Sequence, residues 1–325
     1  MVNILITGIS GQDGLFLTAK LLDQNEKVKI YGTSRNPSKS FFNKLNTLVN
    51  DEKFNNIELI KIDLNNFSNV QNLINDIKPN AVYNFSGPSS VYKSLKDRKN
   101  TSNQIISIFD NLTEALIKSN QFPKFFQASS SEMFGNNPSN FLDERSEFNP
   151  RSPYAVSKLQ NHYKVLELNK KYNWQIKSGI LFNHESEFRD NDYLVMQLIS
   201  SALKIQKKEL SSFEVGSLSY IRDWSFAGDT IDAIYKITNE GSQSNYVIGT
   251  GVEKSIQDMA TTIFSYFDLD LNEFIKINKN LLRKGDPVRV VANPSKLKNE
   301  LFWEPKLQFE DLIHRCIKRR IDYLE

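Results

Sequence analysis

Four side chains suited to acid–base chemistry lie in two short segments of the chain. Ser130 and Glu132 follow a predicted strand, and Tyr154 and Lys158 stand at i and i+4 at the start of a predicted helix. Residues at this spacing share one helix face, and an ammonium beside a phenol stabilises the phenolate and lowers its pKa from about 10. Tyr154 is therefore predicted to act as a general base, with Ser130 binding the same substrate oxygen.

The start of the chain is typical of a dinucleotide-binding turn. A short apolar strand leads into Gly8, Gly11 and Gly14, and a helical pattern follows. Glycines let backbone N–H groups approach a pyrophosphate, which then lies against the positive end of the helix. The spacing is G-x-x-G-x-x-G, for which a tight turn with close helix packing is the alternative explanation. The flanking strand and helix favour the dinucleotide site.

The ends of the next strands indicate which dinucleotide is bound. An acidic residue after the second strand, residues 28–32, would bind the ribose of NAD, but residues 30–37 contain none. Arg35 can pair with a 2′-phosphate, which favours NADP; an ordinary surface arginine is the alternative. Asp63 and Leu64 lie at the end of a third strand, residues 57–62, where Asp63 could meet the adenine amino group. Ser86 follows a fourth, residues 81–84.

Alternating strands and helices predict an α/β fold with a Rossmann-like doubly wound parallel sheet. Ligands of such sheets bind beyond the carboxyl ends of the strands, where Thr7, Asp63, Ser86 and Ser129 are all expected. Residues 1–181 are predicted to form the NADP-binding domain. Residues 182–325 are predicted to form a smaller mixed α/β substrate-binding portion, with segments around 220–250 returning to the Rossmann domain. Later helices are expected at residues 101–119, 193–205, 297–303 and 309–324.

The overall composition argues against several other classes of protein. Lys and Arg number 41 against 38 Asp and Glu, so the net charge of +3 gives no general attraction to nucleic acid or membrane. One cysteine, Cys316, allows no internal disulfide, and a cytoplasmic location is expected. We find no signal peptide and no stretch near the roughly 20 apolar residues of a membrane helix. The histidines show no metal-ligand spacing, so no metal is expected.

Together these motifs resemble the extended short-chain dehydrogenase/reductases, and within them the GDP-mannose 4,6-dehydratases. The matching segments cover nearly the whole chain in order: residues 6–14, 127–135, 150–158, 179–186, 222–224 and 293–296. The Gly-Gln-Asp-Gly turn and the Phe-Asn-His-Glu-Ser run are specific to that subfamily, whereas the Tyr–Lys pair is shared by the superfamily. The cofactor-binding residues that the turn, the strand ends and the resemblance indicate are Gly8, Gly11, Gln12, Asp13, Gly14, Arg35, Asp63, Leu64, Ser86, Tyr154 and Lys158.

Glu132 separates the activities found in this superfamily. Reductases and epimerases need the hydroxyl, Tyr and Lys, whereas 4,6-dehydratases also need a carboxylate beside the sugar C5–C6 bond. In the implied lyase reaction, Tyr154 takes the 4-hydroxyl proton while C4 gives hydride to NADP. Glu132 then removes the C5 proton, water leaves C6 with help from Ser130 or Glu132, and hydride returns to C6. A dipole-stabilised carboxylate at a helix start is the alternative explanation for Glu132.

Other activities stay open from the residues alone. A reductase or C4 epimerase on the same scaffold is the second hypothesis, and a non-catalytic dinucleotide-binding protein is the third. The intact Ser130, Tyr154 and Lys158 argue against the third, because a sensor needs none of them.

The resemblance also implies a nucleotide-sugar site and an oligomer. Arginines would bind the diphosphate and an acid the nucleotide ribose, which gives Ser89, Asn183, Arg189, Arg222, Arg283 and Asp286. The chain departs from the family at Pro88, Ser90, Gln197 and residues 187–190, so a related GDP-hexose or GDP-heptose is an alternative to GDP-mannose. Residues 35–43 resemble a loop that reaches a neighbouring subunit's cofactor site, which implies a homodimer or homotetramer.

Overall fold

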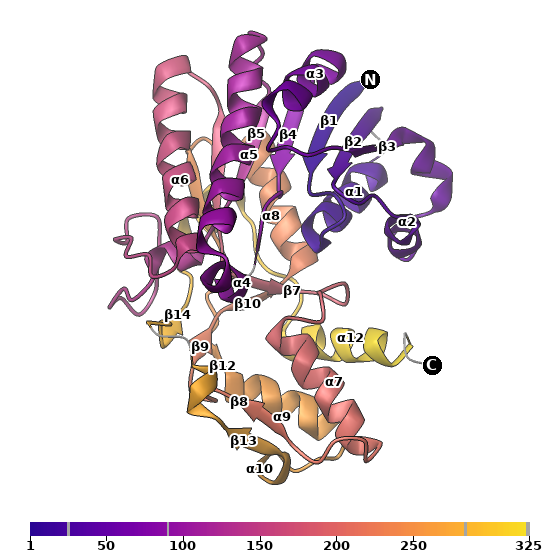
Figure 1. Cartoon of the computed structure of the whole chain (residues 1–325), viewed down its shortest axis with the longest axis vertical. Helices are drawn as coiled ribbons and strands as arrows, with labels where there is room; N and C mark the ends of the chain where they lie inside the picture. The colour runs from indigo at the N-terminus through magenta and orange to yellow at the C-terminus, as the bar shows by residue number, and fades with distance from the viewer. Residues whose placement is uncertain (25–26, 90, 283–284, 323–325) are drawn as a thin grey trace.

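A parallel sheet of seven strands forms the upper part of the molecule in Figure 1. The structure, a computed structural model, describes residues 1–24, 27–89, 91–282 and 285–322. The strands run in the order β11-β6-β5-β4-β1-β2-β3, and each adjacent pair is parallel. Their bounds are β1 Val2–Thr7, β2 Val28–Ser34, β3 Ile57–Lys61, β4 Ala81–Asn84, β5 Lys124–Ser130, β6 Ile176–Leu181 and β11 Asn245–Ile248. The order reverses between β1 and β4, which confirms the predicted Rossmann-like class and creates its ligand-binding crevice.

Helices cover both faces of the sheet because successive residues of each strand point to opposite sides. Leu5 of β1 packs on one face with α3 (Phe67–Ile77), α5 (Arg98–Lys118) and α6 (Pro153–Tyr172). Ile4 and Ile6 of the same strand pack on the other face with α1 (Gln12–Asp23), α2 (Lys39–Leu45) and α8 (Ala227–Glu240). Both faces are apolar, as a buried parallel sheet requires.

The lower part of the molecule has its own core. There α7 (Leu194–Gln206), α9 (Ile256–Tyr266) and α12 (Phe309–Asp322) pack together, with α10 (Leu271–Phe274) beside them (Figure 1). The short strands here are β7 Asn183–Glu185, β8 Phe213–Val215, β9 Ile221–Arg222, β10 Trp224–Phe226, β12 Lys254–Ser255, β13 Ile275–Ile277 and β14 Arg289–Val290. The remaining helices are α4 Val91–Lys96, α11 Ser295–Leu301 and the 3₁₀ helices Asp51–Asn56, Ser131–Phe134 and Lys279–Leu281. None of the helices that the structure describes is long and apolar enough to span a membrane.

Most predicted element boundaries hold within three residues, and the differences have local causes. Helix α5 begins at Arg98 because the Asp97 side chain caps it by accepting from the Asn100 N–H. Strand β5 runs on to Ser130 because its pairing with β6 continues to Leu181. Helix α11 ends at Leu301, since the next residue turns into the left-handed region, so residues 302 and 303, which were predicted to be helical, lie beyond its end. Residues 323 and 324, predicted to end the last helix, lie outside the described residues.

Candidate active site

The three glycines of the β1–α1 turn are needed for different reasons. Gly8 has φ +72°, and a Cβ there would lie 3.0 Å from the backbone carbonyl of Phe85. A Cβ on Gly14 would lie 2.5 Å from the Cα of Ile9. Gly11 has φ −74°, and its Cβ would meet only the Gly8 oxygen at 3.4 Å. Close packing within the chain therefore explains why Gly8 and Gly14 are glycines. Gly11 is under no such constraint, and its lack of a side chain leaves the start of α1 open.

A cavity of about 400 Å³ lies beside this turn, at the carboxyl ends of the sheet strands. Nine of the eleven predicted cofactor-binding residues line it: Gly8, Gly11, Gln12, Asp13, Gly14, Arg35, Asp63, Leu64 and Ser86. Ser89 and Arg189, predicted as substrate ligands, line it as well. The structure thus brings residues from four separate strand ends into one cavity.

The polar groups of this cavity fit an adenine dinucleotide. Thr33 Oγ1 is buried and has no hydrogen-bond partner in the described part of the chain. No side chain caps the start of α1 at Gly11, so its first N–H groups are available to an anion. Asp63 accepts hydrogen bonds from the backbone and side chain of Asn65, which lower its pKa, and Arg35 lowers it further. The cavity therefore offers donors at the turn and a carboxylate beside a cation at its far end.

A buried ion pair joins the turn to the second half of the chain. His184 Nε2 lies 3.1 Å from Asp13 Oδ1, and His184 Nδ1 lies 2.8 Å from the Phe182 carbonyl oxygen. A carboxylate oxygen and a carbonyl oxygen both accept hydrogen bonds, so this arrangement favours the doubly protonated imidazolium. Burial disfavours that charge, but Asp13 outweighs it and raises the pKa of His184. The neighbouring Gln12 donates to the His184 carbonyl oxygen and accepts from Ser186 Oγ, which fixes the same junction.

A second pair, Glu185 and Arg189, lies along the cavity. The Arg189 Nε atom is 2.9 Å from Glu185 Oε2, and both side chains are largely buried. The guanidinium carbon lies 3.6 Å from the centroid of the Tyr193 ring. The Tyr193 hydroxyl in turn lies 2.7 Å from Ser89 Oγ. Arg189 is therefore held within the cofactor cavity.

The four residues predicted to be catalytic come from two adjoining elements. Ser130 ends β5 and Glu132 lies in the 3₁₀ helix that follows, while Tyr154 and Lys158 lie on the first turns of α6. Ser152 caps α6 by accepting from a backbone N–H. Ser130 hydrogen-bonds to Tyr154, and the Glu132 charge acts on the same phenol. Ser130, Glu132 and Tyr154 thus form one cluster, although they do not line the cavity themselves.

Lys158 is held by the backbone of β5, and the pKa of Tyr154 is not lowered as the sequence predicted. Its ammonium donates to the Ala128 carbonyl oxygen at 2.8 Å and lies 5.7 Å from the centroid of the Tyr154 ring. Burial lowers the pKa of Lys158 to about 8, although Asp13 opposes this. Burial also raises the pKa of Tyr154, and the hydrogen bond from Ser130 offsets only part of the rise. The expected lowering of the phenol pKa is therefore absent in this structure.

The remaining predicted substrate ligands lie outside the cavity. Arg222 Nη2 is 3.7 Å from Asp286 Oδ1, and both side chains are about nine-tenths buried. Arg222 also donates to the Ile221 carbonyl oxygen. Asn183 begins β7 and pairs with Trp224 of β10. Arg283 and Ser90 lie outside the described residues.

Sequence reasoning assigned no role to Tyr193, His184 or Thr33. Tyr193 stands just before a helix with no motif around it, so its contacts with Arg189 and Ser89 had no sequence signal. His184 did have one, because it belongs to the distinctive Phe-Asn-His-Glu-Ser run. Within the described ranges, no group of three His, Cys, Asp or Glu side chains could hold a metal ion.

The fold and the site define the class of protein. A glycine turn at the switch point of a doubly wound sheet, beside a helix that carries Tyr154 and Lys158, is the arrangement of an extended short-chain dehydrogenase/reductase.

The comparison with protein families narrows this class. The chain belongs to the GDP-mannose 4,6 dehydratase family, whose model matches residues 5–316. It is 30% identical to GDP-mannose 4,6 dehydratase 1 of Arabidopsis thaliana over 98% of this chain and 89% of that protein.

Solved structures of the same fold carry nicotinamide dinucleotides. A dTDP-glucose 4,6-dehydratase from Bacillus anthracis, in complex with NAD, has a TM-score of 0.85 at 21% identity and covers 99% of this chain and 97% of that chain. RMD from Pseudomonas aeruginosa, complexed with NADPH, has a TM-score of 0.82 at 19% identity and covers 99% of this chain and 100% of that chain.

Proposed function

We propose that the protein is a nucleotide-sugar 4,6-dehydratase, a lyase that converts GDP-mannose to its 4-keto-6-deoxy form with NADP as resident cofactor. The observation that carries this proposal is the position of Glu132. Glu132 follows Ser130 by two residues, and its charge acts on the buried Tyr154 phenol, so one site holds a hydroxyl, a phenol and a carboxylate. The similarity to the Arabidopsis dehydratase over nearly the whole chain supports the same function.

The residues divide the acid–base work. A nicotinamide dinucleotide, when bound, takes up hydride from C4 of the sugar and gives it back at C6. Tyr154, hydrogen-bonded to Ser130, must be a phenolate to receive the proton of the 4-hydroxyl, a form that its burial disfavours, and one proton must return to C5 when hydride reaches C6. The ketone at C4 acidifies the C5 proton, which Glu132 removes and passes to the hydroxyl that leaves C6 as water. Lys158, with a pKa of about 8, is mostly an ammonium at pH 7 and favours anionic charge nearby.

We propose NADP over NAD because of Arg35. It follows directly on β2 and lines the cavity, and no acidic residue between 30 and 37 is present to bind an unphosphorylated ribose. Structures of this fold occur with NAD and with NADPH, so the fold does not decide between them.

We propose that residues 182–325 supply most of the nucleotide-binding groups. Arg222 and Asp286 are nearly buried together and lie apart from the cofactor cavity, as a second polar subsite would. Asn183 and Arg283 are assigned to the diphosphate and Ser89 to the sugar. A related GDP-hexose or GDP-heptose is the alternative substrate.

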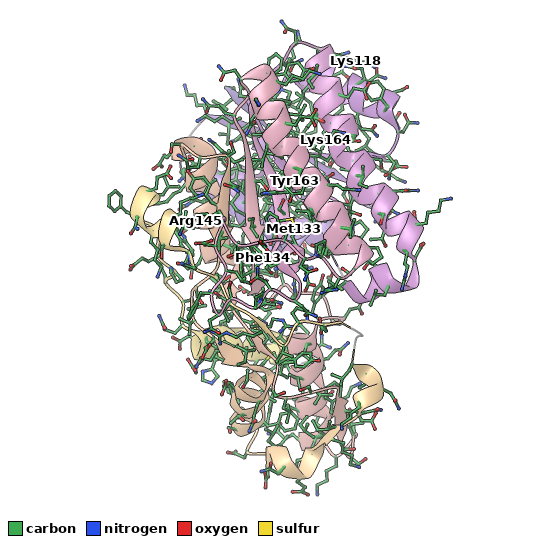
Figure 2. The ribbon with its side chains drawn as sticks, turned by 90° about the vertical axis from the view of Figure 1, so that its left-hand side faces the viewer. Lys118, Met133, Phe134, Arg145, Tyr163 and Lys164 are labelled. Carbon is green, nitrogen blue, oxygen red and sulfur yellow. The ribbon has the colours of Figure 1, made fainter. Side chains whose placement is uncertain are left out.

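We propose a homodimer or homotetramer, in which residues 35–43 reach a neighbouring copy. An apolar strip on α6 supports self-association, because Val156, Tyr163 and Leu166 are 42%, 53% and 37% exposed. Figure 2 shows Tyr163 on the outer face of this helix. Sedimentation of the wild type and of Tyr163→Glu would test this, since a buried charge should lower the assembly state.

The function is tested with GDP-mannose and a catalytic amount of NADP. A dehydratase forms a 4-keto-6-deoxy product without net loss or gain of NADPH, whereas stoichiometric NADPH consumption indicates the alternative reductase and a C4-inverted sugar an epimerase. Glu132→Gln should abolish dehydration and leave cofactor binding intact, and Glu147→Gln, at an exposed position, is the matched control. Unchanged dehydration by Glu132→Gln would contradict the assignment.

A further inference from the structure

A hydrogen bond joins two hydroxyls that line the cofactor cavity. Tyr193 lies at the start of α7, in the lower part of the molecule, and Ser89 lies in the loop after β4 of the sheet. Their hydroxyl oxygens are 2.7 Å apart, and both residues line the cavity. This bond therefore joins the two parts of the molecule across the space between them.

The Tyr193 ring is held in place by the Arg189 side chain. The Arg189 guanidinium lies 3.6 Å from its centroid, and the largely buried Glu185 carboxylate fixes that guanidinium at 2.9 Å. The Tyr193 N–H donates to the Asp190 carbonyl oxygen at 3.2 Å. Ser89, by contrast, is an exposed loop residue. Tyr193 is therefore the more firmly held partner of this hydrogen bond.

Tyr193 also lies close to the acid–base cluster. Its hydroxyl and the Arg189 charge both act on the Tyr154 phenol. Tyr193 thus lines the cofactor cavity and is near enough to Tyr154 for its charge to affect that phenol.

The chemistry of a dehydratase requires a site that stays closed. The sugar is oxidised at C4, loses water and is reduced at C6 before release, so an oxidised sugar that escapes early leaves the cofactor reduced and the enzyme unable to begin another cycle. Closing contacts that exclude water and retain such species are a general means of protection.

We propose that the Tyr193–Ser89 hydrogen bond is a closing contact that retains the oxidised sugar between the two hydride transfers, and that Tyr193 is a positioning residue for this reaction. The proposal rests on the function proposed above. It goes beyond that function because it assigns the retention of the oxidised sugar to one pair of side chains.

Two single variants and their combination test the contact. Tyr193→Phe keeps the ring on Arg189 and removes the hydroxyl, and Ser89→Ala removes the other partner. Tyr266→Phe, at an exposed tyrosine at the end of α9, is the matched control. The readout is the fraction of turnovers that leave NADPH on the enzyme, followed as absorbance at 340 nm against product formed. A second readout, independent of turnover, is the release rate of NADPH by stopped-flow fluorescence.

We expect each single variant to raise the reduced fraction and the release rate about fivefold, as loss of one neutral hydrogen bond implies, with unchanged thermal stability. The double variant should match the singles, because both remove the same bond. The proposal is overturned if Tyr193→Phe leaves no more NADPH on the enzyme per turnover than Tyr266→Phe does. It is also overturned if Tyr193→Phe has an effect that Ser89→Ala does not share. If the wild type forms no dehydrated product, the proposed function itself fails and this inference with it.

Discussion

Replacement of two glycines in one turn by alanine should have opposite effects on stability and cofactor binding. At Gly14 the added Cβ would lie 2.5 Å from Ile9 Cα and 2.6 Å from the Ile9 carbonyl oxygen. Optimal carbon–carbon contacts are about 3.5–4.0 Å, so the overlap is about 1 Å, and it is with backbone that cannot rotate away. Overpacking of this kind costs about 2 kcal/mol, which corresponds to a fall of about 5 °C in Tm.

At Gly11 the same methyl group meets only the Gly8 oxygen at 3.4 Å, and φ of −74° suits alanine. Alanine leaves the unfolded chain fewer conformations than glycine does. Gly11→Ala should therefore raise the free energy of unfolding by up to about 1 kcal/mol. Its methyl group, however, occupies the open start of α1, where a pyrophosphate must approach the backbone, so NADPH affinity should fall at least about tenfold.

The assays are thermal unfolding by circular dichroism and titration with NADPH by calorimetry. Gly11→Ala should unfold at or above the wild-type temperature and bind weakly, and Gly14→Ala should unfold earlier. Wild-type affinity in Gly11→Ala would refute the assignment of this turn to the pyrophosphate. An unchanged Tm in Gly14→Ala would refute the packing argument.

Three further predictions concern single side chains. Burial lowers the pKa of His162 to about 4, so the unfolded chain binds more protons between about pH 6.5 and 4. The free energy of unfolding therefore falls as the pH drops through this window. His162→Asn should make that fall about 3 kcal/mol smaller, measured by urea unfolding at pH 7 and pH 4. Arg35→Ala should weaken NADPH binding at least about tenfold and leave NADH binding nearly unchanged in titrations of both. Asp223 is fully buried and accepts from three backbone N–H groups and a hydroxyl, so Asp223→Asn should lower the free energy of unfolding by about 3 kcal/mol in urea.

The sheet was predictable because its signal is local. Each of the first strands is a short apolar run with a turn residue after it, and β1 illustrates this with Thr7 and Gly8 at its end. The cofactor cavity was predictable for a related reason, since parallel strands bring their carboxyl ends to one edge, and Asp63 and Ser86 needed only their place in the strand order.

Contacts between distant segments were not predictable from the sequence. The Asp13–His184 pair joins residues 171 positions apart, and the Ser89–Tyr193 bond joins residues 104 apart. No local pattern records such pairings. The position of Lys158 has the same origin, because its partner is a backbone oxygen of β5, which is available only once α6 packs on that strand.

Residues 187–190, which depart from the family pattern, make specific contacts with other parts of the chain. Glu187, whose side chain is 7% exposed, pairs with Arg315 of α12, and Phe188 packs against Phe16 of α1 and beneath the Arg319 guanidinium. Two arginines of the last helix, Arg315 and Arg319, thus lie beside this segment. Phe188 lines the cofactor cavity, so these contacts with α1 and α12 help to form the wall of that cavity. The residues to vary in a search for sugar specificity are Ser89, Arg222 and Asp286.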